Sequence, residues 1–404
     1  MDIIIKKPAN NGRLEVISSK SYAIRAILIA AIINSNIKIK TTLSNDILDI
    51  INPLEKLGYV FDESNGYYEI YRKENINKAN IYIDRSATAL RLFMMNSCFF
   101  SKEIIIETSD NLSKRNHTEL INQMRKVGHI VEGENPICIK SFNLQENTLT
   151  FDTNITSQFI SAGLIYIAFN GGKLEYKGDL NSKSYIDMTI QTLRDFGRII
   201  ERKENTFYLK EKTKYKKIYE VEADYSNASY FLASGAFGKV NICNLNPNSI
   251  QQDRKIIDIL KDYGANVKAN TIEKGKYNYL DIDLEQNIDL FSLIAILMTK
   301  KGGVIRNIER LKYKESNRII SLSEMLERLN AKFEINDNNI IIYPSKLKGA
   351  TINSYDDHRI VMAAAFARNL TDEDIIIENY EAVEKSYPQF FEDFKKLGGD
   401  YEIR

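Results

Sequence analysis

The stretch LEKLG at residues 54–58 decides the fold, because close copies of it recur along the whole chain. Each copy has two apolar residues around a charged pair and then Gly or Asn. We interpret each as the end of an amphipathic helix, closed by a residue that tolerates positive φ. The other copies are MRKVG at 124–128, LRDFG at 193–197, LKDYG at 260–264, LERLN at 326–330 and FKKLG at 394–398, so successive copies lie 66 to 70 residues apart. This period predicts six structural repeats.

A second class of helix keeps the same period and is apolar nearly all round. A helix without a polar face must be interior to the protein. Regular helix lengths in any α/β protein could imitate a period, but two independent helix classes at one spacing argue against that reading. Strands such as HIVEG, RIIERK, KFEIN, NIIIYP and DIIIEN complete each repeat as βαβαββ. The apolar helices are expected to begin at Ser21, Ala87, Ser157, Ser226, Asp289 and His358.

The length of 404 residues favours two or three domains. Six repeats divide most naturally into two lobes of three, with residues 19–223 in the first lobe and residues 1–18 and 224–404 in the second. The hinge is expected near residues 222–225, and a short strand before Lys20 is expected to pair with the second lobe. The predicted fold class is therefore α/β, with three βαβαββ repeats in each lobe around buried parallel helices, like an α/β barrel turned inside out.

Composition excludes several classes of protein. Hydrophobic residues make up 44% and charged residues 27%, as in a globular protein with a large core, and the net charge of +1 gives no basic excess for nucleic acid or an anionic membrane. The three cysteines form no C-x-x-C pair, so neither a disulfide framework nor a thiolate zinc site is indicated. The opening MDIIIKKPANNGRLEV lacks the pattern of an export signal, and no apolar run spans a bilayer. We expect a cytoplasmic protein.

Polar and charged side chains gather at the starts of the apolar helices. The N-terminus of a helix favours anions, and capping alone explains Ser157, Ser226 and Asp357. Cations are disfavoured there, so the basic residues predict an anionic ligand between the helix starts, in one cleft between the lobes. The residues at these starts are Lys20, Ser21, Arg25, Arg91, Ser157, Gln158, Asp224, Asp289, Asp357, His358 and Arg359.

At these positions the chain resembles the EPSP synthase family (3-phosphoshikimate 1-carboxyvinyltransferases) within the enolpyruvyl transferases. The resemblance runs from Ile17 to Pro388, and its segments are specific in combination, not singly. They are SSKSYAIR (18–25), SATALR (86–91), Arg115, TSQF (156–159), KGDLNSKSYIDMT (177–189), ASYFLA (228–233), Asp289, YKESNR (313–318), DDHR (356–359) and KSYPQFF (385–391). Members of this family fold as two lobes of three βαβαββ units.

The resemblance implies transfer of the carboxyvinyl group of phosphoenolpyruvate to the 5-hydroxyl of shikimate 3-phosphate, with release of phosphate. This addition–elimination step belongs to the shikimate pathway of aromatic amino-acid biosynthesis, and it uses no metal or cofactor. The implied partners are these two small-molecule substrates, and we expect a monomer without nucleic-acid or membrane partners. By the same resemblance, shikimate 3-phosphate is held by Ser21, Arg25, Thr156, Ser157, Gln158, Ser182, Tyr185, Asp289 and Lys314.

The family pattern also implies the second substrate site and the acid–base groups. Phosphoenolpyruvate is expected against Lys20, Ala87, Arg115, Gln158, Arg318, Arg359 and Lys385, where Arg forks suit carboxylate and phosphate. Asp289 is the expected base on the attacking hydroxyl and Glu315 the expected proton donor to the methylene carbon, with Lys20 as a third catalytic residue. Which of these three groups moves which proton stays open.

Structural readings compete with these roles. Lys314, Glu315 and Arg318 would open an amphipathic helix and could form a solvated salt-bridge ladder. Arg91 lies on an apolar helix, where a buried structural ion pair is as good a reading as ligand contact. His358 could equally be a structural cap or a donor to a neighbouring site residue.

The chain departs from the family pattern at three positions near the expected phosphoenolpyruvate site. Ala87 replaces a glycine, no proline follows Arg91, and Asn116 follows Arg115 where proline is usual. The inhibitor glyphosate lies against that glycine in the family, so the methyl group of Ala87 predicts weak inhibition with phosphoenolpyruvate use largely kept.

Two other functions stay open. The sister transferase that uses UDP-N-acetylglucosamine shares the repeat, but it usually begins with a K-N pair where Lys20 and Ser21 stand. It also carries a loop cysteine that neither Cys98 nor Cys138 matches. A non-catalytic repeat protein that binds an anionic metabolite is the second alternative, and the presence of both Asp289 and Glu315 argues against it.

Overall fold

The computed structural model describes residues 1–142, 148–152, 156–180 and 182–404. These residues form two compact units. The first unit is Ser18–Glu222, and the second unit combines Met1–Ile17 with Ala223–Arg404. Among the described residues, no helix is both long enough and apolar enough to span a membrane.

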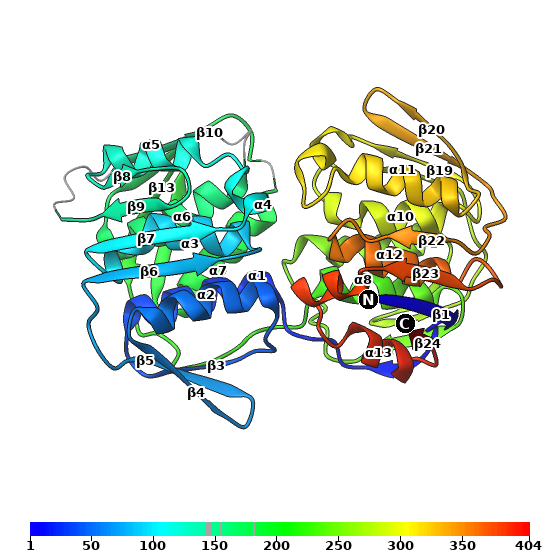
Figure 1. Ribbon diagram of the computed structural model, residues 1–404, viewed down its shortest axis with the longest axis horizontal. Coiled ribbons are helices and arrows are strands. Elements are labelled where there is room, and N and C mark those ends of the chain that lie inside the picture. Colours follow the sequence, from blue (N-terminus) through cyan, green and yellow to red (C-terminus); the bar gives the residue numbers. More distant parts are fainter. Residues whose placement is uncertain (143–147, 153–155, 181) are drawn as a thin grey trace. The chain divides into compact units, whose positions relative to one another are not determined.

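The first unit contains three four-stranded sheets, with strand orders β14-β3-β5-β4, β6-β7-β9-β8 and β10-β11-β13-β12 (Figure 1). Its strands are β3 (Ile37–Lys40), β4 (Tyr59–Ser64), β5 (Tyr67–Arg72), β6 (Lys78–Ile83), β7 (Glu103–Thr108), β8 (Ile130–Glu132), β9 (Ile137–Lys140), β10 (Thr148–Asp152), β11 (Lys173–Lys177), β12 (Arg198–Lys203), β13 (Thr206–Lys212) and β14 (Ile218–Glu220). Its helices are α1 (Lys20–Ile33), α2 (Asn45–Lys56), α3 (Ala87–Asn96), α4 (Asp110–Ser113), α5 (Thr118–Lys126), α6 (Ser157–Asn170), α7 (Lys183–Asp195) and the 3₁₀ turn η1 (Ser97–Phe99).

The second unit repeats this plan, with sheets ordered β16-β17-β15-β2, β18-β19-β21-β20 and β22-β23-β1-β24. Its strands are β1 (Asp2–Lys7), β2 (Asn11–Leu14), β15 (Lys239–Ile242), β16 (Asn266–Lys268), β17 (Thr271–Glu273), β18 (Leu280–Asp283), β19 (Gly303–Arg306), β20 (Lys332–Asn336), β21 (Asn339–Tyr343), β22 (Thr351–Asn353), β23 (Ile375–Glu378) and β24 (Asp400–Ile403). Its helices are α8 (Tyr225–Gly235), α9 (Ile256–Asp262), α10 (Phe291–Met298), α11 (Arg318–Arg328), α12 (His358–Ala367) and α13 (Phe390–Lys396), with 3₁₀ turns η2 (Gln252–Lys255), η3 (Ile288–Leu290), η4 (Glu309–Tyr313) and η5 (Tyr380–Lys385).

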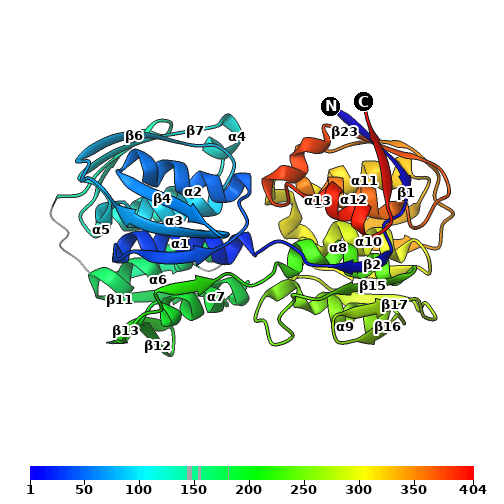
Figure 2. The ribbon, with the colours of Figure 1, turned by 90° about the horizontal axis from the view of Figure 1, so that it is seen from below.

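The sheets around α3, α6 and α10 are each formed by one contiguous βαβαββ repeat, as the sequence predicts, whereas the other three sheets each take one strand from elsewhere in the chain. In the repeat of α3, for example, β6 and β7 pair in parallel, while β9 runs antiparallel to both β7 and β8. Three strands come from distant parts of the chain: β14 completes the sheet of β3, β2 completes that of β15, and β1 lies between β23 and β24. Figure 2 shows β2 beside β15. The expected N-terminal strand is thus observed as two strands within the second unit.

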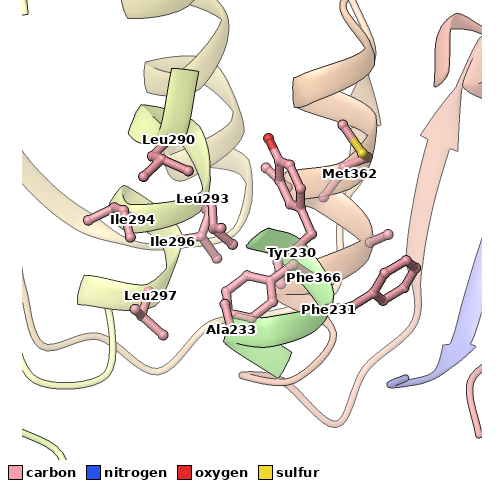
Figure 3. Close-up of a cluster of buried hydrophobic side chains, with 14 of the residues drawn as sticks. Tyr230, Phe231, Ala233, Leu290, Leu293, Ile294, Ile296, Leu297, Met362 and Phe366 are labelled. Carbon is pink, nitrogen blue, oxygen red and sulfur yellow. The ribbon is translucent and has the colours of Figure 1, made fainter. Parts of the chain in front are cut away.

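The six apolar helices form the two cores. In the first unit α3 contacts both α1 and α6, and in the second unit α8, α10 and α12 contact one another. Figure 3 shows Tyr230 and Phe231 of α8, Leu293 of α10 and Met362 of α12 in one buried apolar cluster. Hydrogen bonds join both the starts and later parts of α8 and α12, and likewise of α3 and α6, so the helices of each pair run parallel.

The residues that close the amphipathic helices have the predicted conformation. Gly58, Gly128, Gly197, Gly264 and Gly398 have φ values of 86°, 101°, 72°, 92° and 84°, and Asn330 has φ 61°. The repeated Gly or Asn therefore marks the turn that returns the chain from helix to strand.

Two helix starts differ from the sequence expectation. Asp289 lies in the 3₁₀ turn η3, and α10 begins only at Phe291. Lys314 and Glu315 precede α11, which begins at Arg318 with Asn317 as its N-cap. Their side chains are therefore placed by irregular backbone between elements, whose geometry apolar periodicity does not record.

We predict that Gly58→Ala destabilises the first unit more than Gly66→Ala does. Both glycines have positive φ, which costs an alanine about 1–2 kcal/mol. An added Cβ at Gly58 would also collide with the carbonyl oxygen of Glu74, whereas one at Gly66 would meet nothing within 4 Å. We expect the free energy of unfolding of Gly58→Ala to fall by roughly 2 kcal/mol more than that of the control. Equal losses in urea denaturation would contradict the steric part of this explanation.

Candidate active site

The second unit holds a buried cluster of charges around Arg318, whose side chain is 1% exposed. Its Nη1 donates to Asp289 Oδ1 at 2.7 Å, its Nη2 to Glu315 Oε2 at 2.6 Å, and its Nε to Asp357 Oδ2 at 2.8 Å. One guanidinium thus orients three carboxylates from three separate segments. The i, i+3 ion pair considered for this helix start is observed between Glu315 and Arg318, but it is not solvated, because Arg318 is buried.

Arg359 extends the cluster to two further elements. Its Nη1 donates to the backbone oxygen of Asp289 at 3.1 Å, its Nη2 to Ser226 Oγ at 2.7 Å, and its Nε lies 3.4 Å from Asp289 Oδ1. Arg359 is the second residue of α12 and Ser226 the second of α8, so these two helices start side by side. Asn369 Nδ2, just after α12, donates to Ser234 Oγ near the end of α8 at 3.2 Å, so the two helices run parallel.

Two lysines face the same carboxylates. Lys314 Nζ lies 3.3 Å from Asp289 Oδ1, and Lys385 Nζ lies 3.9 Å from Glu315 Oε1. Burial alone would raise the pKa of Asp289, but the positive charges of Arg359, Lys314 and Arg318 outweigh burial and hold that pKa well below its usual range. Burial lowers the pKa of Lys314. Asp289 is therefore an ionised carboxylate at neutral pH, shared among three cations.

The first unit places Lys20 at the start of α1. Its Nζ donates to Asp46 Oδ2 at 2.5 Å, and Asp46 lies in the first turn of α2. The side chains of Lys20 and Asp46 are 19% and 6% exposed. Lys20 and Arg359 are therefore both paired with acids. The sequence alone suggested that an anionic ligand is needed to balance these cations, but the structure shows protein carboxylates in that role.

Arg25 is buried against neutral acceptors. Its Nε donates to Thr189 Oγ1 at 2.8 Å, its Nη1 to the Ser21 oxygen at 2.7 Å, and its Nη2 to Ser161 Oγ and the Tyr185 oxygen, both at 3.3 Å. Burial lowers its pKa to about 10. The Arg25 to Ser161 bond joins the second turns of α1 and α6.

Arg91 is the centre of a third polar group. Its Nη1 donates to Gln158 Oε1 at 2.6 Å, its Nη2 to the Asn116 oxygen at 3.0 Å, and its Nε to His117 Nδ1 at 3.4 Å. Gln158 Nε2 in turn donates to Thr88 Oγ1 at 2.9 Å, which joins the first turns of α6 and α3. The ion-pair reading of Arg91 is wrong among the described residues, where its hydrogen-bond acceptors are amide, carbonyl and imidazole groups.

The remaining expected ligand residues lie around these groups. Ala87 is the first residue of α3 and is buried, and Ser182 precedes α7 with φ 53°. Tyr185, in the first turn of α7, is half-buried, as is Arg115 after α4. Burial, and to a smaller extent the charge of Arg115, lowers the pKa of Arg91 to about 10.

The capping roles expected at three helix starts need correction. Thr156, not Ser157, caps α6 by accepting from the Gln158 N–H at 3.3 Å. Asp224, not Ser226, caps α8 by accepting from the Asn227 N–H at 2.8 Å. Asp357 caps α12 as expected, which excludes His358 as the cap: His358 is buried, with Nδ1 3.8 Å from Asp357 Oδ1.

Sequence reasoning missed several residues that orient the site. Asp46 holds Lys20, Asp253 receives a hydrogen bond from Ser226, and Thr189 receives one from Arg25. Asp49 accepts from the backbone N–H groups of residues 84–86 and so fixes the entry to α3. Only Thr189 belongs to a segment that carried the resemblance. Asp46 and Asp49 lie in the amphipathic helix α2 and Asp253 in the 3₁₀ turn η2, and in sequence such a carboxylate looks like an ordinary surface charge.

The two charge groups differ in what they can do chemically. The second unit holds two carboxylates, Asp289 and Glu315, that can exchange protons beside fixed cations, whereas the first unit offers cations and neutral donors suited to holding anions. Within the described part of the chain, no group of three or more His, Cys, Asp or Glu side chains is placed to bind a metal ion.

Comparisons with solved structures identify the fold. An EPSP synthase from Acinetobacter baumannii is 22% identical and matches with a TM-score of 0.80, covering all of both chains. The enolpyruvyl transferase NikO from Streptomyces tendae is 13% identical with a TM-score of 0.73, covering 99% of this chain and 98% of the other. The fold is therefore the two-lobe α/β fold of enolpyruvyl transferases.

Sequence comparisons narrow this class to one family. Residues 5–394 match the family model described as EPSP synthase (3-phosphoshikimate 1-carboxyvinyltransferase). The 3-phosphoshikimate 1-carboxyvinyltransferase of Methanocaldococcus jannaschii is 33% identical over 100% of this chain and 99% of its own length. That of Clostridium acetobutylicum is 32% identical over 96% and 95%. The chain belongs to the EPSP synthase family of transferases.

We predict that His117 and His129 stay neutral at pH 5.5. Burial lowers both pKa values to about 4, and the charges of Arg91 and Arg115 add to the effect at His117. Their ring NMR signals should therefore stay constant from about pH 7.5 to 5.5. Because the unfolded chain binds these protons near pH 6.5, the stability from both groups is present above that pH and is lost as pH falls toward 4. A titration midpoint near 6.5 in the folded protein would contradict the burial of these rings.

Proposed function

We propose that this protein transfers the carboxyvinyl group of phosphoenolpyruvate to the 5-hydroxyl of shikimate 3-phosphate, releasing phosphate, in the shikimate pathway. The family match over residues 5–394 carries this proposal. The Arg318 cluster supports it, because it gathers Asp289, Glu315, Lys314, Arg359 and Lys385, which the resemblance assigns to this reaction.

Asp289 is proposed as the base for the attacking hydroxyl. In this cluster the pKa of Asp289 is too low for effective proton abstraction, because the charges of Arg359, Lys314 and Arg318 hold it down. An anionic substrate that pairs with Lys314 and Arg359 would partly neutralise them and thereby raise the pKa of Asp289. Substrate binding would in this way convert a structural counter-ion into a general base.

Glu315 is proposed as the proton donor to the methylene carbon, with Lys20 facing phosphoenolpyruvate as a third catalytic group. Glu315 accepts from Arg318 and lies near Lys385, so it must gain a proton before it can donate one. An ammonium at Lys20 would stabilise the negative charge of the substrate and of the transition state together.

The substrate contacts follow the family pattern. Shikimate 3-phosphate would be held by Ser21, Arg25, Thr156, Ser157, Gln158, Ser182, Tyr185, Asp289 and Lys314, and phosphoenolpyruvate by Lys20, Ala87, Arg115, Gln158, Arg318, Arg359 and Lys385. These sets draw on both units, so we propose that residues 19–223 and residues 1–18 with 224–404 act as two lobes that close on substrate. Arg25 and Arg318 are both nearly fully buried against protein acceptors, so they would exchange these acceptors for substrate oxygens on binding. We further propose a cytoplasmic monomer.

The decisive assay is phosphate release from phosphoenolpyruvate. Release should require shikimate 3-phosphate and should be absent when either substrate is omitted. Turnover with UDP-N-acetylglucosamine in its place would favour the sister transferase, and phosphoenolpyruvate binding without phosphate release would favour a non-catalytic protein.

Asp289→Asn and Glu315→Gln should each fold normally and lose most of kcat. Positioned acid–base groups contribute about 10²- to 10⁴-fold, and neither amide can take their roles. Circular dichroism checks folding, and phosphate release measures kcat. Near-wild-type turnover in either variant would remove that residue from its proposed role.

Ala87→Gly should raise sensitivity to glyphosate while changing the KM for phosphoenolpyruvate much less. Ala87 is buried in the first turn of α3, one residue before Thr88, which accepts from Gln158. Its methyl group should obstruct the longer inhibitor at a cost of roughly 1–3 kcal/mol, about 5- to 150-fold in affinity. Inhibition constants of the two proteins measure the effect, and equal sensitivity would contradict the steric explanation.

A further inference from the structure

Asp253 is a buried carboxylate, and in the part of the chain that the structure describes it forms no hydrogen bond or ion pair with the expected substrate residues. It lies in η2 and is 4% exposed. It accepts a hydrogen bond from Ser226 Oγ in the first turn of α8, and the same oxygen accepts from Arg359 Nη2 at 2.7 Å. A chain of two hydrogen bonds therefore runs from Asp253 through Ser226 to Arg359.

The segment that carries Asp253 is fixed on both sides. Gln251 accepts from the Tyr225 N–H at 3.0 Å and donates to the Ala223 oxygen at 2.7 Å, which ties the segment to the start of α8. Asn287 Nδ2 donates to the Gln252 oxygen at 2.6 Å, which ties it to the turn before Asp289. Asp253 is therefore held by the same elements that position Arg359.

The hydroxyl of Ser226 determines which group donates and which accepts in each of these two hydrogen bonds. Serine has a single O–H, and because that proton is donated to Asp253, the oxygen lone pairs are left for Arg359. The guanidinium is then fixed by Ser226 Oγ and by the backbone and side-chain oxygens of Asp289. A positioned cation holds an anion with less loss of side-chain freedom than a mobile one does.

We infer that Asp253 is a positioning residue, which orients Arg359 through Ser226 and tunes the positive charge that Arg359 offers to phosphoenolpyruvate. This inference rests on the proposed function, in which Arg359 holds that substrate. Asp253 itself touches no reacting atom.

The charge of Asp253 makes this tuning depend on pH. Arg359 faces it from α12, Asp289 from η3, and Ser226 and the cap Asp224 from α8. Burial raises its pKa to about 6, even though Arg359 opposes that shift. As pH rises through about 6, Asp253 ionises, and its negative charge partly offsets the positive charge of Arg359. The affinity of Arg359 for an anion should therefore fall.

Ser226 variants test the positioning step. Ser226→Ala removes the hydrogen-bond chain and should raise the KM for phosphoenolpyruvate about 10-fold or more, the usual effect of losing a hydrogen bond to a charged group. The KM for shikimate 3-phosphate should change little, and Ser226→Thr, which keeps the hydroxyl, should restore the phosphoenolpyruvate KM. Equal KM values in the Ala and wild-type proteins would overturn the inference.

Asp253→Asn tests the charge. It preserves shape and an acceptor oxygen but cannot ionise, so at pH 8 it should bind phosphoenolpyruvate more tightly than wild type does. The ratio of kcat/KM between the two proteins, followed from pH 5 to 8, cancels the titration of the substrate's own phosphate group. We expect that ratio to change around pH 6, and a flat ratio would overturn the inference.

Asp393→Asn is the matched control. Asp393 is another buried carboxylate of the second unit, 1% exposed, that accepts from Tyr387 and Lys396. Its loss should lower stability while leaving the phosphoenolpyruvate KM unchanged. Failure of the proposed function would appear separately, as a wild-type protein that releases no phosphate from the two substrates.

Discussion

The parallel packing of apolar helices is the constraint on which the rest of the structure depends. Three such helices in each unit point like-signed dipole ends in one direction, and each N-terminus carries about half a positive charge. Lys20, Arg91 and Arg359 add full charges in or near those first turns. The protein balances these ends with groups from other elements, such as Asp46 from α2 and Asp289 from η3. Because these charges must be balanced, polar and charged side chains are concentrated at one end of each core.

The two units meet this need differently, and the difference suits the proposed division of labour. In the second unit, Arg318 alone orients Asp289, Glu315 and Asp357. In the first unit, Arg25 and Arg91 lie against hydroxyl, amide and carbonyl groups, and burial lowers the pKa of each to about 10. An arginine exchanges a neutral acceptor for an anion more readily than it exchanges a carboxylate, because no ion pair must be broken. The arginines of the first unit are thus suited to binding an anion, whereas the second unit combines expected anion contacts with the two carboxylates proposed to move protons.

The inferred role of Asp253 follows from the same balance. A buried acid that does not touch the ligand can still set how strongly a neighbouring cation attracts it. Ser226 connects Asp253 to Arg359, since its single proton is donated to Asp253 and its oxygen accepts from Arg359. Ionisation of Asp253 would leave the contacts between Arg359 and phosphoenolpyruvate in place. It would change only how strong those contacts are at each pH.

The sequence by itself determined the repeats, because positive φ after a helix demands Gly or Asn and an all-apolar helix demands burial; Gly58 and Asn330 show this directly. It also determined most of the charged residues of the Arg318 cluster through their motifs. Only the tertiary structure decided the partners: Asp46 for Lys20, Asp253 for Ser226 and neutral acceptors for Arg91. It also decided that β1, β2 and β14 complete sheets begun far away in the chain. Local patterns record backbone conformation and burial, whereas pairing between distant side chains depends on a geometry that exists only after the helices pack.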